Sequence, residues 1–300
     1  MIEPDDMPLV TIVACCHNHE NFVVETLDSI RKQDYSNIEC IIINNTPGPS
    51  TRIIKSWLAA YQLNYTYIEN STIRNATENL QLGLLHAKGK YFQFLSCDDV
   101  LMLNKISSQV KLMELPEHIG VGLIHGEMVN INEFGEVVGK SRVQNLPQKP
   151  ISLFKKIFCY GFVIHTPTVL IRLSSVNKQT ILDPAIPVED FQMFLAISAI
   201  ADTLYIKTIV TQYRILQNSL SKSGLTLSTR SRVISKYSNN KYYPLALKFD
   251  ELRSLVNHIK HGQIRPKMSY LLTYLRYINT PVYYNLIKFS LLRPLDRFGS

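Results

Sequence analysis

The segment YFQFLSCDD, residues 91–99, decides how the fold of this chain is interpreted. Its first seven residues have the length and the apolar composition of a buried strand, and the carboxylates of Asp98 and Asp99 follow where that strand ends. In open α/β sheets, ligands bind outside the carboxyl ends of the strands. Two hard oxygen ligands at such an edge suit Mg²⁺ or Mn²⁺, and the metal in turn suits a diphosphate. The dipeptide alone is weak evidence, because it also occurs in the polar leader at Asp5-Asp6.

Strand and helix patterns alternate up to this segment. Buried strands are predicted at 9–16, 39–43, 65–68 and 91–95, and helices at 20–32, 53–61 and 80–89. This β-α-β-α-β order is typical of an α/β fold with a mostly parallel sheet and helical crossovers. Because parallel strands end at the same edge, the polar turn at 44–49 should lie beside Asp98 and Asp99 as a second candidate ligand loop.

The patterns downstream are less regular. Residues 100–103 lead into a helical pattern, strands are predicted within 119–145 around a turn at 132–135, and an apolar strand ends at 171–172. Pro187 and an acidic pair, Glu189 and Asp190, precede another helical pattern. Because acidic side chains stabilise a helix N-terminus, a purely structural role as a helix start is one interpretation of this pair.

The composition is that of a globular protein, with 46% hydrophobic and 19% charged residues among 300. That length allows one large α/β domain or a domain with an appendage. No apolar run reaches the roughly 18 residues of a spanning helix, and the acidic N-terminus leads us to expect no secretory signal. The five cysteines show no metal or redox spacing, which suggests reduced, packed thiols of a cytosolic protein.

Charge is distributed unevenly along the chain. Residues 205–300 contain 16 Lys and Arg against three acids, a balance of +13, whereas residues 1–204 have a balance of −5. Such a basic tail suggests an anionic partner, which could be a membrane surface, nucleic acid or an anionic polymer. Apolar stripes at helical spacing over 252–259 and 268–278, with tyrosines and basic residues between them, favour a membrane surface.

Four motifs occur in a fixed order, and each is weak by itself. They are an opening strand with an Asn-containing loop and a Leu-x-Ser-Ile helix at 10–35, Asn79 with an Ala-x-Gly-x-Tyr approach to Asp98-Asp99 at 79–99, Glu189-Asp190, and Tyr213-Arg214 with Asn218-Ser219-Leu220-Ser221. Together they resemble the catalytic domain of glycosyltransferase family 2, a GT-A fold, over roughly residues 8–220. The resemblance implies a Rossmann-like, mostly parallel sheet flanked by helices, with a C-terminal helical extension.

The resemblance also implies a domain organisation. Residues 1–225 would form the GT-A catalytic domain, with a nucleotide-sugar half at about 8–100 and an acceptor half at about 101–225. Residues 226–300 would form a basic, Tyr-rich helical extension. We expect this extension to attach a cytoplasmic enzyme peripherally to the inner face of the membrane, near a lipid-linked acceptor. The alternative is that its helices only pack on the catalytic domain, with their charges solvated.

The activity implied by the resemblance is a metal-dependent, inverting transfer of a sugar. The donor would be a nucleotide-diphosphate sugar, and the acceptor a hydroxyl of a glycan or lipid-linked molecule in bacterial surface-polysaccharide synthesis. By resemblance, Asp99 would hold Mn²⁺ or Mg²⁺, Asp98 would contact the ribose or a metal-bound water, and Asp190 would be the general base. By resemblance, six residues would bind the nucleotide: Cys15, Asn18, Asn44, Asn45, Asn79 and Asp98.

Two positions depart from the family pattern. Asn44-Asn45 replaces the usual Asp-Asp after the second strand, so base preference is open, although an amide oxygen can still accept from a ring N–H. Leu216 replaces a histidine that the family often places near the metal and the diphosphate. Another group would have to substitute, or metal affinity would be lower. Four histidines carry no ligand spacing and are interpreted as structural or surface residues: His17, His86, His125 and His165.

Two rival functions follow from these features. The departures allow a non-catalytic relic that binds nucleotide sugars, although intact Asp99 and Asp190 argue against it. The basic tail allows a nucleic-acid-binding protein. Tyrosines and leucines at helical spacing look more like an amphipathic surface than a base-stacking platform, so we expect no nucleic-acid partner.

Overall fold

The computed structural model describes residues 7–61, 64–140, 146–161, 164–216, 225–260, 263–264 and 267–273. The chain divides into two compact units, Met1–Phe154 with Val163–Ser223, and Lys155–Phe162 with Gly224–Ser300. The motif Asn218–Ser221 and the last predicted stripe beyond Thr273 lie outside the described residues.

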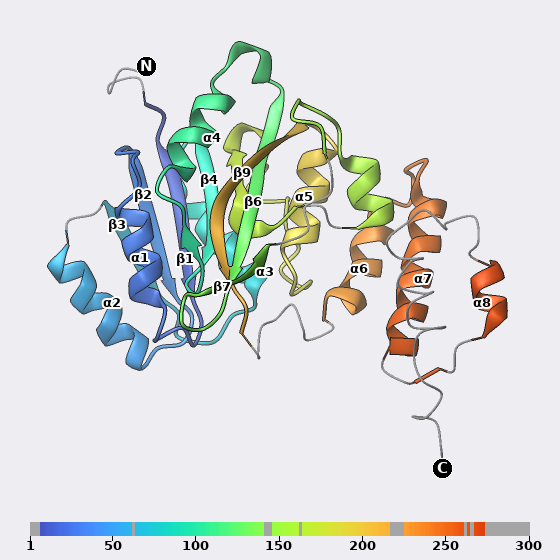
Figure 1. Cartoon of the computed structure of the whole chain (residues 1–300), viewed down its shortest axis with the longest axis horizontal. Coiled ribbons are helices and arrows are strands. Elements are labelled where there is room, and N and C mark those ends of the chain that lie inside the picture. The colour runs from blue at the N-terminus through green and yellow to red at the C-terminus, as the bar shows by residue number, and fades with distance from the viewer. Residues whose placement is uncertain are drawn as a thin grey trace. The chain divides into compact units, whose positions relative to one another are not determined.

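The first half of the sheet in the first unit is parallel. It contains β1 (Val10–Cys16), β2 (Ile38–Asn44), β3 (Tyr65–Glu69) and β4 (Tyr91–Ser96), in the order β3-β2-β1-β4 (Figure 1). The connecting helices are α1 (Val23–Arg31), α2 (Pro49–Ala60) and α3 (Ala76–His86). This half confirms the predicted β-α-β-α-β order. Strands β1 and β2 are buried along their whole length, which explains why they read as continuous apolar runs.

The second half of the sheet is mixed. Its elements in chain order are β5 (Val100–Leu101), α4 (Lys105–Met113), β6 (Val121–Ile131), β7 (Val137–Lys140), β8 (Val169–Arg172), α5 (Asp190–Ser198) and β9 (Asp202–Arg214). The described sheet runs β3-β2-β1-β4-β8-β6-β9-β5, with β7 on β6. Strand β8 is antiparallel to both β4 and β6, whereas β9 is parallel to β6 and antiparallel to β5. Short helical turns occupy Pro116–His118, Thr166–Thr168 and Leu173–Ser175.

The residues after Asp99 contain a short strand that sequence did not predict. Residues 100–103 were expected to lead into a helical pattern, and α4 does begin at Lys105, but Val100 and Leu101 first form β5. The reason is tertiary: Val100 pairs with Gln212 of β9, a partner that local sequence does not reveal. The chain that leaves β4 is therefore paired with β9 and lies against α1.

The second unit is helical in its described part. It contains a π-helical turn, η3 (Lys156–Tyr160), with α6 (Leu225–Ser235), α7 (Tyr243–Lys260) and α8 (Met268–Thr273). Tyr160 meets Phe249 of α7 edge to face, with ring centroids 4.8 Å apart. No described helix is both long and apolar enough to cross a membrane.

The stripe at 252–259 corrects one expectation about this unit. Its residues Leu252, Val256 and Ile259 are buried, and α7 packs against η3. This stripe therefore forms the core of its own unit rather than an apolar face for lipid. An amphipathic pattern shows that one face is covered, but not what covers it.

Candidate active site

The loops that follow the parallel strands meet at one edge of the sheet. Cys16 at the end of β1 pairs with Asn44 at the end of β2, and Cys15 pairs with Ser96 at the end of β4. The predicted site residues that follow these strands are therefore neighbours in space, as the parallel order requires. They form the floor of the candidate site.

The two carboxylate oxygens of Asp98 have different surroundings. Its Oδ2 lies 3.8 Å from Nε2 of His19, in the loop after β1. Its Oδ1 is buried and accepts no hydrogen bond within the described part of the chain. A buried carboxylate oxygen without a donor is costly, and a bound cation is one way in which proteins satisfy such an atom. The side chain of Asp98 therefore fits a cation.

Asp99 is surrounded differently. It is 2% exposed, and its Oδ1 accepts from the backbone N–H of Arg214 at 3.0 Å. Its backbone carbonyl accepts from Oγ1 of Thr26 at 2.7 Å. Burial and the charge of Asp98 raise the pKa of Asp99 well above its ordinary value, and Arg214 acts in the opposite direction. Asp99 thus anchors the turn through its Oδ1, and its role as the metal ligand stays a prediction; the side chain of Asp98 is a second candidate for that role.

A metal at this edge would rely on few protein side chains. The described residues contain no group of three or more His, Cys, Asp or Glu side chains placed to bind one ion. Mg²⁺ typically takes one or two carboxylates and obtains its other ligands from substrate phosphates and water. Asp98, beside His19, fits a metal of that kind, which arrives with a diphosphate.

The amide of Asn45 belongs to a buried network. Its Oδ1 accepts from Nδ2 of Asn70 at 2.8 Å and from the backbone N–H of Arg74 at 2.9 Å. Nδ2 of Asn70 also donates to Oδ1 of Asn79 at 2.8 Å. Both lone pairs of the Asn45 oxygen are therefore used, so the expectation that it accepts from the nucleotide base does not fit this geometry. Asn45 and Asn79 instead tie the loops after β2 and β3 to the start of α3.

Asn44 is fully buried and also committed to protein partners. Its Nδ2 donates to Oγ1 of Thr51 at 3.0 Å and to the hydroxyl of Tyr67 at 3.2 Å. Its Oδ1 accepts from Oγ of Ser50 at 3.1 Å. These contacts hold the start of α2 against β2 and β3. Asn44 therefore shapes the site from below, and contact with a base is not supported.

The loop after β1 also contains His19, a site residue that sequence reasoning missed. Asn18 adopts a left-handed backbone conformation with φ 57°, and its N–H donates to Oγ1 of Thr46 at 2.9 Å. This turn brings His19 to Asp98. The backbone N–H of His17 donates to Nδ1 of His19 at 3.5 Å, so in a neutral imidazole the proton lies on Nε2, which faces Asp98. The only sequence signal was its place beside Asn18 after the first strand.

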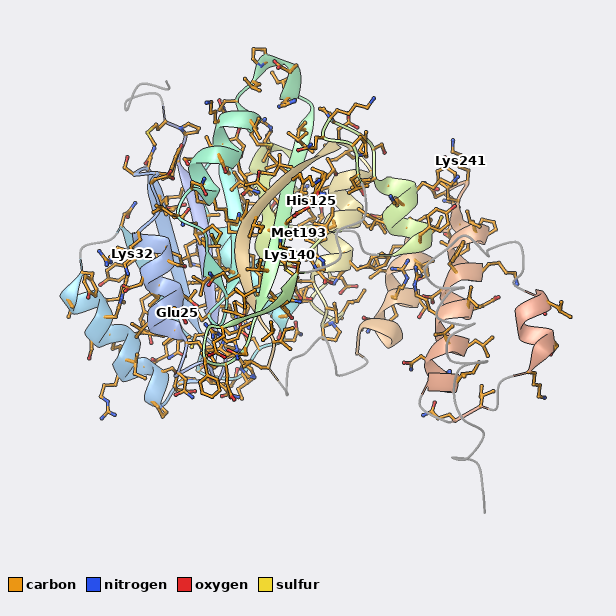
Figure 2. The ribbon with its side chains drawn as sticks, in the orientation of Figure 1. Glu25, Lys32, His125, Lys140, Met193 and Lys241 are labelled. Atoms are coloured by element: carbon orange, nitrogen blue, oxygen red, sulfur yellow. The ribbon has the colours of Figure 1, made fainter. Side chains whose placement is uncertain are left out.

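His125 and the five cysteines are buried in the structure. His125 lies inside the first unit (Figure 2), and its burial lowers its pKa to about 3, so it is neutral. All five cysteines are buried free thiols. Burial and the neighbouring charges of Cys16 and Glu189 raise the pKa of Cys15.

The second acidic pair starts α5. Oδ1 of Asp190 accepts from the N–H of Phe191 at 2.7 Å. Burial raises the pKa of Asp190 to about 6, while burial and the Asp190 charge raise that of Glu189 to about 8. Because the charge of Glu189 also acts on the Cys15 thiol, the start of α5 lies near the carboxyl end of β1. The loop before α5 is fastened to α3, since Oγ1 of Thr77 donates to the carbonyl of Ile186 at 2.6 Å.

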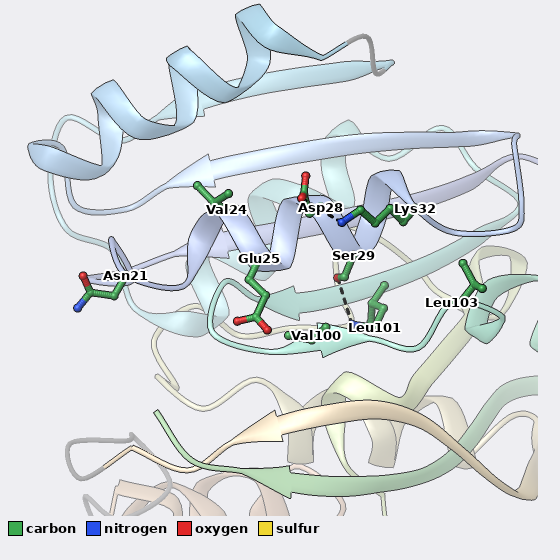
Figure 3. A pocket seen from close by; sticks show the side chains of 9 residues that line it. All are labelled: Asn21, Val24, Glu25, Asp28, Ser29, Lys32, Val100, Leu101 and Leu103. Atoms are coloured by element: carbon green, nitrogen blue, oxygen red, sulfur yellow. Dashed lines mark hydrogen bonds and ion pairs between the residues drawn. The ribbon is translucent and has the colours of Figure 1, made fainter. Parts of the chain in front are cut away.

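A separate cavity of about 580 Å³ lies between α1 and β5 (Figure 3). The residues that line it are Asn21, Val24, Glu25, Asp28, Ser29, Lys32, Val100, Leu101 and Leu103. None of the predicted site residues is among them. Its acidic groups already have cationic partners, because Asp28 pairs with Lys32 and Glu25 with Arg214. The candidate active site is therefore the carboxyl edge of the sheet rather than this cavity.

The parallel half of the sheet ends in the carboxylate pair Asp98-Asp99. The mixed half is accompanied by α5, which begins with a second pair, Glu189-Asp190. This arrangement is that of the GT-A class of fold. Solved structures support this: TarS 1–349 of S. aureus in complex with UDP-GlcNAc has a TM-score of 0.67 at 13% identity, covering 94% of this chain and 90% of that one. The mannosyltransferase PcManGT from Pyrobaculum calidifontis, in complex with GDP-Man and Mn²⁺, has a TM-score of 0.60 at 14% identity, covering 99% and 90%.

Sequence comparison defines the family. The model of glycosyl transferase family 2 matches residues 11–165, just over half of the chain. The chain belongs to glycosyltransferase family 2. An uncharacterized glycosyltransferase of Rickettsia bellii is 27% identical over 221 residues, which cover 72% of this chain and 31% of the relative. The chain spans about a third of the length of the Rickettsia relatives that it matches.

Proposed function

We propose that this chain transfers a sugar from a nucleotide-diphosphate sugar to a hydroxyl of a glycan or lipid-linked acceptor, with inversion at the anomeric carbon. The observation that carries the proposal is the buried Oδ1 of Asp98 at the carboxyl edge of the parallel strands, which accepts no hydrogen bond from the residues that the structure describes. We assign the activity to the first unit, whose fold is shared with TarS bound to UDP-GlcNAc and PcManGT bound to GDP-Man and Mn²⁺.

The donor side of the site would be formed by the loops after β1 and β4. Asp98 would hold Mn²⁺ or Mg²⁺, which when bound offsets the charge that grows on the leaving diphosphate. Asp99 would keep the turn in place from inside the protein. His19 would present its Nε2–H toward the diphosphate, and so take the place of the family histidine whose position is Leu216 here. Cys15 and Asn18 would border the nucleotide.

The acceptor side would be formed by the start of α5. An acceptor hydroxyl is a poor nucleophile, and a carboxylate must take its proton on the face opposite the leaving group. We assign that role to Asp190. Its pKa of about 6 supports the assignment, because a general base works best when its pKa is close to the operating pH. Glu189, whose pKa of about 8 keeps its carboxyl largely protonated near neutral pH, would be the poorer base of the two.

A thermal-shift screen tests the proposal. The chain is heated with UDP, GDP and their sugars, with and without Mn²⁺, and we expect at least one ligand to raise the melting temperature more with Mn²⁺ than without. Asp98→Asn should lose the Mn²⁺-dependent part of the shift. If no nucleotide shifts the melting temperature under either condition, the proposal is wrong. Binding without transfer to any glycan or lipid-linked acceptor would favour the non-catalytic relic.

A further inference from the structure

Arg214 is a fully buried arginine at the end of β9. It is 1% exposed, and its backbone N–H already holds Oδ1 of Asp99. Its guanidinium donates to four acceptors: the carbonyl of Asp98 at 2.9 Å, the carbonyls of Asn132 and Glu133 at 2.8 and 3.2 Å, and Oε2 of Glu25 at 2.5 Å. One side chain thereby joins α1, the turn after β4 and the turn between β6 and β7.

The charge of Arg214 is balanced at one point. Glu25 in α1 accepts from Nη2, and half of its side chain remains exposed. The close-up of the cavity shows Glu25 extending from α1 toward β5, the strand that follows Asp99 (Figure 3). The guanidinium also lies 4.5 Å from the ring centroid of Phe22. A buried cation that is paired and donates four hydrogen bonds in this way forms a rigid connection rather than a loose contact.

We propose that Arg214 is a positioning residue for the metal site. It holds the Asp98–Asp99 turn from two sides, through the carbonyl of Asp98 and the carboxylate of Asp99. With the backbone fixed, the side chain of Asp98 is presented with an unpartnered Oδ1. This inference rests on the proposed function, because it assumes that Asp98 takes a divalent cation with a diphosphate.

Lysine cannot reproduce this arrangement. Arg214 spreads its donors over acceptors from three separate segments, which a planar fork can reach simultaneously. A lysine ammonium is a single point with three donors and would release at least one segment. If the carbonyl of Asp98 is released, its carboxylate loses its fixed position, and the cation loses affinity without any change in the ligands themselves.

A second buried arginine provides the matched control. Arg172 in β8 is 9% exposed and donates to the carbonyls of Val121 and Met113 at 3.0 and 2.6 Å. It pairs with Tyr91 at the start of β4, the end of the strand opposite Asp98. Arg172→Lys therefore disrupts a buried arginine with backbone partners in the same sheet, away from the metal site.

The test measures the affinity for Mn²⁺ by electron paramagnetic resonance. It is done in the presence of UDP and, separately, of GDP. Arg214→Lys should weaken Mn²⁺ binding at least ~10-fold, as loss of a group that orients a metal ligand commonly does. Arg172→Lys should stay within about twofold of the parent in this assay, while both variants lower the melting temperature. Parent-like Mn²⁺ affinity in Arg214→Lys would overturn the inference.

Glu25→Gln is the second variant, in case Arg214→Lys does not fold. Its side chain is half exposed and keeps an acceptor for Nη2, so we expect a folded protein with Mn²⁺ binding weakened about threefold. If Arg214→Lys is unfolded and Glu25→Gln binds Mn²⁺ like the parent, the inference is wrong. A parent chain that binds no Mn²⁺ with either nucleotide contradicts the proposed function, and the inference falls with it.

Discussion

Asp98 and Asp99 are adjacent in sequence, but their surroundings separate their roles. Oδ1 of Asp98 accepts no hydrogen bond from the described residues, whereas Oδ1 of Asp99 accepts one from the backbone N–H of Arg214. Asp98→Asn should therefore lower turnover at least ~10²-fold, because it removes the charge that faces the cation. Asp99→Asn should cost about tenfold or less, since an amide oxygen can still accept from Arg214. Initial rates in a Mn²⁺ titration measure both.

The opposite ranking would restore the assignment expected from sequence. If Asp99→Asn is inactive and Asp98→Asn is near normal, Asp99 is the ligand after all. Melting temperatures of the two variants serve as the control. A large drop for Asp99→Asn alone would indicate that its lost activity comes from the turn rather than from the ion.

The general base can be tested by conservative substitution. Asp190→Asn should keep nucleotide binding and abolish transfer, because only proton removal is lost. Glu189→Gln should be milder. A purely structural helix start makes a different forecast, namely a lower melting temperature with turnover retained. Transfer assays and thermal-shift binding on the same two variants separate these outcomes.

The raised pKa values of this pair predict opposite trends with pH. Asp190 can accept a proton only when it is ionised, so turnover should rise as pH increases through about 6. In the native state, the pair keeps protons that the unfolded chain releases near pH ~4. The unfolding free energy should therefore fall as pH rises from about 4 to about 8. Asp190→Asn and Glu189→Gln should each flatten the stability profile, and unchanged profiles would contradict the shifted pKa values.

At the scale of elements, close packing explains why a glycine, Gly89, stands in the Ala-x-Gly-x-Tyr motif before β4. A Cβ on Gly89 would lie 2.7 Å from the backbone N of Thr11 in β1 and 2.8 Å from the carbonyl of Leu9, which directly precedes β1. Backbone atoms cannot move aside as a flexible side chain can. Gly89→Ala should therefore destabilise the protein by about 1–3 kcal/mol. Gly120→Ala is the control, since nothing lies within 4 Å of its Cβ position.

Denaturant unfolding measures the difference between the two glycine variants. Equal midpoints for Gly89→Ala and Gly120→Ala would mean that β1 and the start of β4 can separate at little cost. A lower unfolding midpoint for Gly89→Ala than for Gly120→Ala would show that Gly89 keeps β1 and the start of β4 close together. The carboxyl edge of the sheet depends on that spacing, because Asp98 follows β4 and His19 follows β1.

At the scale of the whole molecule, the charge of the C-terminal third points to an anionic surface. The stripe at 252–259 is buried, so attachment would depend mainly on basic side chains. Arg232, Lys236 and Lys241 are exposed in the second unit. Each basic residue near an anionic leaflet contributes about 1 kcal/mol. Reversing these three to Glu should weaken sedimentation with anionic vesicles at least ~10-fold, and binding by the parent should fall as salt increases.

The matched control reverses three exposed lysines of the first unit, Lys111, Lys140 and Lys207. This variant changes the net charge by the same amount as the triple variant of the second unit. Equal losses for both triple variants would mean that attachment follows total charge and not the second unit. Parent binding to nucleic acid on filters, with no binding to vesicles, would favour the nucleic-acid alternative.

The sequence by itself determined the parallel half of the sheet and its edge. Strands β1, β2 and β4 are continuous apolar runs because helices cover them, and that signal is local. Parallel strands necessarily end together, so the position of Asp98 and Asp99 beside the loops after β1 and β2 followed from order alone. The motifs that indicated the family are likewise local.

Only the tertiary structure decided what each polar group does at that edge. Arg214 lies 115 residues from Asp99 and 189 from Glu25 along the chain, so no local pattern predicts which carboxylate oxygen is already paired. The partners of the Asn45 Oδ1 lie 25 and 29 residues away, and η3, which packs against α7, also comes from a separate part of the chain. Hydrogen-bond capacity is limited to a few donors and acceptors per side chain. A residue's availability for a ligand therefore depends on partners that only folding brings together.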